Sequence, residues 1–223
     1  LLPPAGRVEF IVSAPPPGTK GVLFTKAIDG GPAGDSNPAR PIASIETTAT
    51  PAKLRRMPER SGPPHKQRGE QRADARGTAM RDLYFSEIPG TSGRGADGLK
   101  FYITVQGQFL KLFDPNDPPA ITTTQGAVED WTIENHTSEV HEFHIHQIHF
   151  LLLEANGKKV PKRLQQFYDT YQVDYWTGTG DFPSIKVRMD FRGAVTGDFV
   201  YHCHILDHED GGMMAIIRVN PKT

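Results

Sequence analysis

Residues 201 to 214 read YHCHILDHEDGGMM, which places two histidines, the only cysteine of the chain, a third histidine and two methionines close together. Thiolate, imidazole and thioether groups bind soft and borderline metal ions, so metal binding is the first hypothesis. A second stretch, HEFHIHQIHF at residues 141 to 150, holds four of the nine histidines. A metal-binding arrangement therefore has to account for both stretches.

The two stretches lie within a region of short alternating segments that runs from residue 81 to residue 223 and is divided by Gly, Pro, Asn and Asp. This pattern predicts an all-β Greek-key sandwich of about 140 residues, with one helical turn near residues 161 to 166. The predicted strands are DLYFSEI at 82–88, KFYITV at 100–105, VEDWTIEN at 128–135, EFHIHQIHFLLLEA at 142–155, YDTYQVD at 168–174, SIKVRMDF at 184–191, GDFVYHCHI at 197–205 and MMAIIRV at 213–219.

Two further β-rich runs precede this region, RVEFIVS at 7 to 13 and KGVLFTK at 20 to 26, and the turn APPPGT separates them. An isolated hairpin is marginally stable in water, so these two predicted strands belong to something larger. From about residue 28 the composition becomes turn-rich and then charged, and residues 46 to 80 carry prolines and few large apolar residues. Such a composition predicts a charged, proline-rich linker.

The composition argues against several classes of protein. The formal net charge of −1 gives no excess of basic residues for binding nucleic acid. The sequence contains no run of about eighteen apolar residues, so it predicts no membrane-spanning helix. A single cysteine cannot form a disulfide within the chain, so its thiol is free to bind metal. The chain opens on LLPPAGRVEF without a methionine or a signal peptide, so this end of the sequence leaves the location undecided.

Strand parity sorts the metal-binding side chains into two sets. Residues two apart in an extended chain point to the same face, so Cys203 points away from its neighbours His202 and His204. One face collects two histidines, the cysteine and a methionine, which is the ligand set of a blue, type 1 copper centre. The other face collects imidazoles alone, which suits copper that meets O₂. The first set is Cys203, His141, His208 and Met213, and the second is His144, His146, His202 and His204.

Both stretches resemble the copper-binding motifs of multicopper oxidases. HEFHIH is similar to the H-x-x-H-x-H motif of the family, and HCHILDHEDGGMM is similar to its H-C-H-x₃-H-x₄-M motif, with every ligand spacing kept. The resemblance covers residues 81–223 as the C-terminal cupredoxin domain. LLPPAGRVEFIV is similar to the last strands of the preceding, middle cupredoxin domain, which would occupy residues 1–45. Glu142 is a departure, because relatives often have Pro there, and we expect it to touch no ligand and to affect only the local loop shape.

The resemblance implies four coppers per complete unit and a role for each ligand. Type 1 copper would oxidise substrates one electron at a time, and the path from Cys203 to its neighbours would carry electrons to a trinuclear cluster that reduces O₂ to two waters. A secreted or periplasmic location is also implied. The type 1 ligands would be His141, Cys203, His208 and Met213, the type 2 ligand His144, and the binuclear type 3 ligands His146, His202 and His204.

Three nearby residues are interpreted from the same resemblance. Glu209 matches an acidic residue that assists proton delivery toward the oxygen site in bacterial relatives, and a solvated loop acid is the alternative. Met214 has the wrong phase for a ligand and is assigned to packing. His149 shares the parity of His141, but the motif needs no ligand there, so we expect it in the core or beside the ligands.

The resemblance also indicates what residues 1–223 lack. The trinuclear cluster of the family takes eight histidines, four of them from two H-x-H pairs in an N-terminal domain, and no further H-x-H occurs here. We therefore expect half of a catalytic unit, the C-terminal part of a laccase-like oxidase completed by a complementary N-terminal multicopper oxidase polypeptide. Five dispersed methionines favour phenols and aromatic amines as reductants, so a metallo-oxidase acting on Cu(I) or Fe(II) is one alternative. The other is a stand-alone blue-copper electron-transfer protein, although such a carrier has no use for four imidazoles beyond its thiolate.

Overall fold

The computed structural model describes residues 1–47, 79–90 and 98–223. These residues divide into two compact units, the larger made of 1–7, 31–34, 79–90 and 98–223 and the smaller of 8–30 and 35–47. The smaller unit contains one two-stranded antiparallel sheet, in which β1 (Lys20–Thr25) pairs with β2 (Arg40–Glu46).

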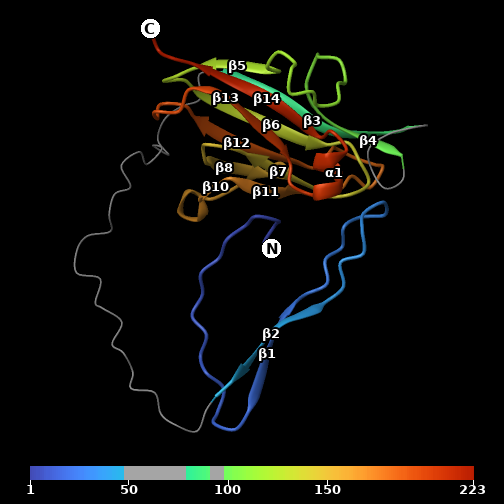
Figure 1. Cartoon of the computed structure of the whole chain (residues 1–223), viewed down its shortest axis with the longest axis vertical. Helices are drawn as coiled ribbons and strands as arrows, with labels where there is room; N and C mark the ends of the chain where they lie inside the picture. Colours follow the sequence, from blue (N-terminus) through green and yellow to red (C-terminus); the bar gives the residue numbers. More distant parts are fainter. Residues whose placement is uncertain (48–78, 91–97) are drawn as a thin grey trace. The chain divides into compact units, whose positions relative to one another are not determined.

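Two sheets form the larger unit, and their strands other than β9 are labelled in Figure 1. The first sheet has the order β10-β8-β12-β6-β3-β4, with β9 paired to β8. Its strands are β3 (Ala79–Pro89), β4 (Leu99–Val105), β6 (Val128–Asn135), β8 (Phe150–Ala155), β9 (Lys158–Lys159), β10 (Phe167–Tyr168) and β12 (Ser184–Asp190). The second sheet has the order β11-β7-β13-β14-β5. Its strands are β5 (Ile121–Thr124), β7 (His141–Ile145), β11 (Thr170–Val173), β13 (Gly197–Cys203) and β14 (Met214–Asn220), and the connections carry the short helices η1 (Lys162–Leu164) and α1 (Leu206–Asp210).

The core of the larger unit is built from side chains of both sheets. Buried residues alternate along the neighbouring strands β6 and β12, because successive side chains of a strand point to opposite faces. Trp131 of β6 packs edge-to-face on Tyr201 of β13 with ring centroids 5.8 Å apart, and both side chains are fully buried. Such an aromatic pair adds about 0.5–1.5 kcal/mol beyond the area it buries, so it helps to hold one sheet on the other.

The predicted all-β sandwich is confirmed, with differences at several elements: β9 was not predicted, and the predicted strand at 168–174 is divided between β10 and β11. The run EFHIHQIHFLLLEA forms two strands, since β7 ends at Ile145, β8 begins at Phe150, and Gln147 between them has a positive φ of 65°. Positive φ is uncommon outside glycine and marks a turn that alternation of apolar residues does not reveal. β5 and α1 were not predicted, because four and five residues are too short to give a periodic signal.

The prediction for the smaller unit was partly wrong. Residues 20 to 26 contain β1 as expected, but residues 7 to 13 form no strand, and β1 pairs with β2 instead. A turn does form in APPPGT, with Gly18 at a φ of 78° and the Thr19 N–H donating to the Pro16 carbonyl at 3.1 Å, but no strand precedes it to pair with β1. Most of the predicted linker lies outside the described residues, so the division into domains at 1–45, 46–80 and 81–223 stays a prediction. Among the described residues, no helix is long and apolar enough to cross a membrane.

Candidate metal centre

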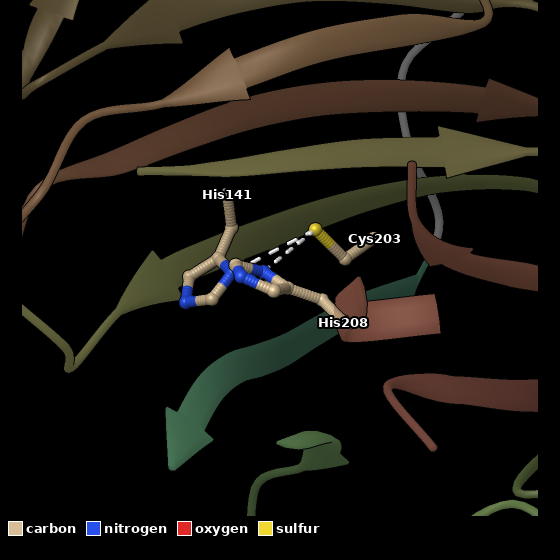
Figure 2. Close-up of side chains that lie close together, drawn as sticks. All are labelled: His141, Cys203 and His208. Atoms are coloured by element: carbon tan, nitrogen blue, oxygen red, sulfur yellow. Dashed lines mark hydrogen bonds between the residues drawn. The ribbon is translucent and has the colours of Figure 1, made fainter. Parts of the chain in front are cut away.

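Three buried side chains from three different elements bring their donor atoms together. His141 opens β7, Cys203 closes the adjacent antiparallel strand β13, and His208 lies on α1. Cys203 Sγ lies 3.6 Å from Nδ1 of His141 and 3.6 Å from Nδ1 of His208, and the two nitrogens are 3.0 Å apart. Figure 2 shows the thiol and both imidazoles converging on one point. Three of the four side chains of the first predicted set, His141, Cys203 and His208, therefore lie together in the fold.

A tight return after α1 holds this set in place. Gly211 packs so closely on Phe101 that an added Cβ would lie 2.4 Å from that ring, and Gly212 has a φ of +106°, which favours glycine. After this turn the Met213 N–H donates to the His208 carbonyl (2.9 Å), and the Cys203 N–H donates to the Met213 carbonyl (3.0 Å). The side chain of Met213 is fully buried. The main chain thus fixes the methionine next to both the cysteine and the second histidine.

The far nitrogens of both imidazoles face oxygen acceptors. His208 Nε2 lies 3.1 Å from Glu139 Oε1, and His141 Nε2 lies 3.1 Å from Glu87 Oε1. Thr137 Oγ1, whose own proton goes to Asn135, accepts a hydrogen bond from His141 Nε2 at 2.9 Å. Acceptors at Nε2 place a ring proton there and leave the Nδ1 lone pair to bind metal, which is the usual outer shell of a metal-bound histidine.

Sequence reasoning missed these two carboxylates. Glu139 stands two residues before His141, so its proximity to the motif was a signal that could have been used. Glu87 lies on β3, in the other sheet from His141, and nothing in its local sequence marks it. Glu87, Glu139 and His141 form a third group of side chains whose donor atoms lie close enough to share an ion.

The electrostatics of the first set favour a bound cation. Burial raises the pKa of the Cys203 thiol, but the hydrogen-bonded rings of His141 and His208 outweigh burial and lower it to about 6. Burial lowers the pKa of His208, but the thiolate and Glu139 raise it to about 10. The sulfur is therefore anionic near neutral pH, and a metal ion can replace the protons held by the imidazoles around it.

The second set of histidines lies on the opposite side of the same two strands. His202 of β13 is paired with His144 of β7, and their ring centroids are 5.1 Å apart. His146 Nε2 approaches His202 Nε2 to 3.1 Å, and the His204 ring lies 5.0 Å from that of His144. His202 is buried, His144 and His204 are half-buried, and His146 is exposed. The four imidazoles therefore gather at a face that is open within the described residues.

The main chain orients the two paired imidazoles of this second set. His144 donates from Nδ1 to the Asp169 carbonyl (2.8 Å), and His202 donates from Nδ1 to the Cys203 carbonyl (2.9 Å). Each ring therefore keeps the lone pair of Nε2 for a metal ion. Burial lowers the pKa of His144 to about 4, so this imidazole is neutral at physiological pH, as a ligand must be.

The structure shows where three residues near the ligands lie, and the expectations for them have different outcomes. Glu209 is half-buried, and its Oε2 lies 3.3 Å from Nδ1 of His202, so it is not a freely solvated loop acid. His149 is exposed, so its expected place in the core was wrong, and its Nε2 lies 3.9 Å from Oδ2 of Asp169, whose carbonyl accepts from His144. The expectation that Glu142 touches no ligand was also wrong, because its main-chain N–H donates to Cys203 Sγ at 3.4 Å.

Comparison with known proteins decides the family. Residues 99–223, more than half of the chain, match the family model described as multicopper oxidase. The chain belongs to the multicopper oxidase family. It is 34% identical over 129 residues to the multicopper oxidase mco of Staphylococcus haemolyticus and 33% identical to that of Staphylococcus epidermidis. Each match covers 55% of this chain and 26% of the relative, so the chain spans about a quarter of the length of these curated multicopper oxidases.

Solved multicopper oxidases share the fold. A multicopper oxidase of Campylobacter jejuni, described as a metallo-oxidase, superposes with a TM-score of 0.62 at 22% identity, over 93% of this chain and 42% of that one. The laccase-like multicopper oxidase CueO of Ochrobactrum sp. superposes with a TM-score of 0.51 at 25% identity, over 84% of this chain and 40% of that one. The predicted cupredoxin-like fold is thereby confirmed.

The donor sets of this multicopper oxidase chain fit copper. The first set offers two imidazole nitrogens and one thiolate in a dry site, which is the ligand chemistry of blue copper. The second set offers imidazoles alone, three of them with nitrogens close enough to share ions: His144, His146 and His202. The family implies copper as the metal, whereas the role of each ligand stays a prediction.

Proposed function

We propose that this chain is the C-terminal part of a laccase-like multicopper oxidase. It would oxidise phenols or similar one-electron donors at type 1 copper and reduce O₂ at a trinuclear cluster completed by an N-terminal domain outside residues 1–223. The observation that carries the proposal is the arrangement around Cys203. Its sulfur meets His141 and His208, while its neighbours His202 and His204 gather with His144 on the other side.

Copper at the first set would supply one-electron oxidation of a donor, and copper at the second would supply four-electron reduction of O₂ to water. The residues of the chain contribute the connection between the two sets. The Cys203 main chain joins its thiolate directly to His202 and His204, and its carbonyl also accepts the hydrogen bond from His202 Nδ1. Two short routes, one covalent and one through a hydrogen bond, therefore link the donor atoms of the two sets.

The ligand assignments follow the predicted motifs. In the proposal, burial of the first set excludes water from the thiolate, and Glu209 beside His202 would assist proton delivery toward the oxygen site. The family resemblance further supports a secreted or periplasmic location. The type 1 ligands would be His141, Cys203, His208 and Met213, the type 2 ligand His144, and the binuclear type 3 ligands His146, His202 and His204.

One observation favours a second candidate function, oxidation of a metal ion. Glu87 and Glu139 lie 3.1 Å from the far nitrogens of the two histidines of the first set. Carboxylates attract cations, and oxygen ligands suit Fe(II) better than Cu(I), which prefers sulfur ligands. Among metal ions, the described residues therefore favour Fe(II) as the donor.

Copper counting tests the half-enzyme proposal. The isolated chain should bind about one copper tightly, at the set whose ligands are all local, become blue and show little oxidase activity. Adding an N-terminal multicopper oxidase polypeptide with two H-x-H motifs should raise the count to about four and switch activity on. Native mass spectrometry with copper analysis would contradict the proposal if the chain alone held four coppers and turned over. One blue copper with no gain on adding the partner would instead indicate an electron carrier.

A substrate panel separates laccase from metallo-oxidase. The reconstituted protein would be assayed with phenols, Cu(I) and Fe(II), together with a Glu87→Gln, Glu139→Gln double variant. Loss of Fe(II) oxidation with phenol oxidation retained would assign the carboxylates to a metal-ion donor. Efficient phenol oxidation without Fe(II) oxidation in the unmodified protein would support the laccase-like function and contradict oxidation of Fe(II).

A further inference from the structure

We propose that the main-chain N–H of Glu142 raises the reduction potential of the type 1 copper by donating a hydrogen bond to the Cys203 thiolate. This inference rests on the proposed function of that set. The Glu142 nitrogen lies 3.4 Å from Cys203 Sγ, and the two residues are 61 positions apart in the chain. The hydrogen bond from Glu142 to the sulfur comes from its main chain.

The register of β7 and β13 directs this N–H at the sulfur. The paired positions of the two strands end at Cys203 with Phe143. One residue further, the Glu142 carbonyl still accepts a hydrogen bond from the His204 N–H at 2.8 Å, whereas the Glu142 N–H turns to Cys203 Sγ. Both polar main-chain groups of residue 142 thus point toward β13 and the residue after it. The N–H contacts the Cys203 sulfur of the first set, and the carbonyl contacts the main chain of His204, which belongs to the second set.

Burial makes this hydrogen bond effective. Glu142 is 4% exposed and Cys203 is fully buried, so water does not compete for the sulfur. A hydrogen bond to a buried, charged acceptor is stronger than one between neutral groups. The hydrogen bond withdraws electron density from the thiolate. The weaker thiolate donor stabilises Cu(II) less relative to Cu(I), so the reduction potential rises. Hydrogen bonding around the cysteine sulfur is a recognised means of tuning such a site.

The type of residue at position 142 decides whether this hydrogen bond can form. Proline has no N–H and could not donate it, whereas every other residue type has the N–H. The same site with proline at position 142 would therefore have a lower type 1 potential.

Two variants of one position test the inference in the copper-loaded chain. Glu142→Pro removes the N–H together with the carboxyl group, whereas Glu142→Gln replaces the carboxyl group, whose pKa burial raises to about 8, with an amide of similar size and keeps the N–H, so comparing the two variants tests the N–H. Redox titration should give a lower type 1 potential in Glu142→Pro than in Glu142→Gln. The thiolate-to-copper absorption should also move to lower energy in the proline variant, because the sulfur becomes a better donor. Equal potentials and equal band positions would overturn the inference.

The backbone of the preceding residue suits a proline at position 142. His141 lies in strand β7, and an extended conformation is the one that a residue before proline adopts. Should Glu142→Pro fail to fold, a backbone ester at position 142 replaces the N–H with oxygen while a side chain is kept, and the potential should fall in the same way. An ester variant with an unchanged potential would also overturn the inference. If neither the unmodified chain nor Glu142→Gln becomes blue with copper, the type 1 assignment itself fails.

Discussion

Glu209 Oε2 lies 3.3 Å from Nδ1 of His202, the same nitrogen that donates to the Cys203 carbonyl. Glu209 directly follows His208 in α1, so one helical turn brings a histidine to the buried thiolate and a carboxylate to the back of the second set. The two candidate sites are therefore joined twice, once through Cys203 in β13 and once through α1.

We predict that Glu209→Gln slows reduction of O₂ more than reduction of type 1 copper by the donor. The amide keeps the shape of the side chain but cannot relay protons, and a lost proton-transfer group costs about a hundredfold or more. Stopped-flow measurement of the two half-reactions in the reconstituted enzyme would test this, with the exposed Asp210→Asn as the control. Equal slowing of both half-reactions would remove the proton role of Glu209.

We predict that Met213 is the axial ligand. Its side chain is fully buried, and its main chain is hydrogen bonded to both Cys203 and His208. Met213→Leu should raise the type 1 reduction potential, because a weak thioether donor to Cu(II) is lost. Met214→Leu, one residue further in β14, is the matched control and should leave the potential unchanged. A shift in the Met214 variant alone would contradict the assignment.

We predict that Cys203→Ser abolishes the intense blue absorption of the copper-loaded chain and halts oxidation of the donor. The absorption arises from charge transfer between a thiolate and copper, and serine has no thiolate. Serine is close to cysteine in size, so circular dichroism should show the folded sandwich retained. A folded variant that stays blue would show that the sulfur of Cys203 is not the ligand.

A buried ion pair beside the core gives a prediction about stability. Glu129 is 3% exposed and accepts hydrogen bonds from Arg81, Thr123 and Trp131. Arg81→Met would leave this carboxylate buried without its cation, which costs about 3 kcal/mol. Urea unfolding would measure the loss, and Arg218→Met, which breaks an exposed pair with Asp198, should change the free energy of unfolding little. A similar loss of free energy of unfolding in both variants would contradict the larger contribution assigned to the buried pair of Glu129 and Arg81.

The same carboxylate predicts how stability depends on pH. Burial raises the pKa of Glu129, but its hydrogen bonds with Arg81, Thr123 and Trp131 outweigh burial and hold that pKa below the ordinary value. Its contribution is therefore complete above the unfolded pKa of about 4.3 and is lost as the pH falls through the lower pKa of the folded state. The difference in free energy of unfolding between the unmodified chain and Glu129→Gln should shrink below about pH 4. A difference that stays constant across this range would contradict the lowered pKa.

The sequence by itself predicted which side chains belong to each set, and it determined the directions of those that lie in strands. The period of two along a strand is a local property, so Cys203 had to point away from His202 and His204 whatever the rest of the fold did. The alternation of apolar residues likewise predicted most strands of the sandwich. It did not predict the turn at Gln147 or the short β5 and α1, because segments of a few residues have no measurable period.

Only the tertiary structure decided what surrounds the donors. Glu87 reaches His141 from the other sheet, and the Glu142 N–H reaches the Cys203 sulfur across the end of the β7–β13 pairing. β1 likewise pairs with β2 rather than with the segment before it. Each of these contacts depends on strand order and register, which are set by the packing of distant segments. A period read along one segment carries no information about the segment that will lie beside it.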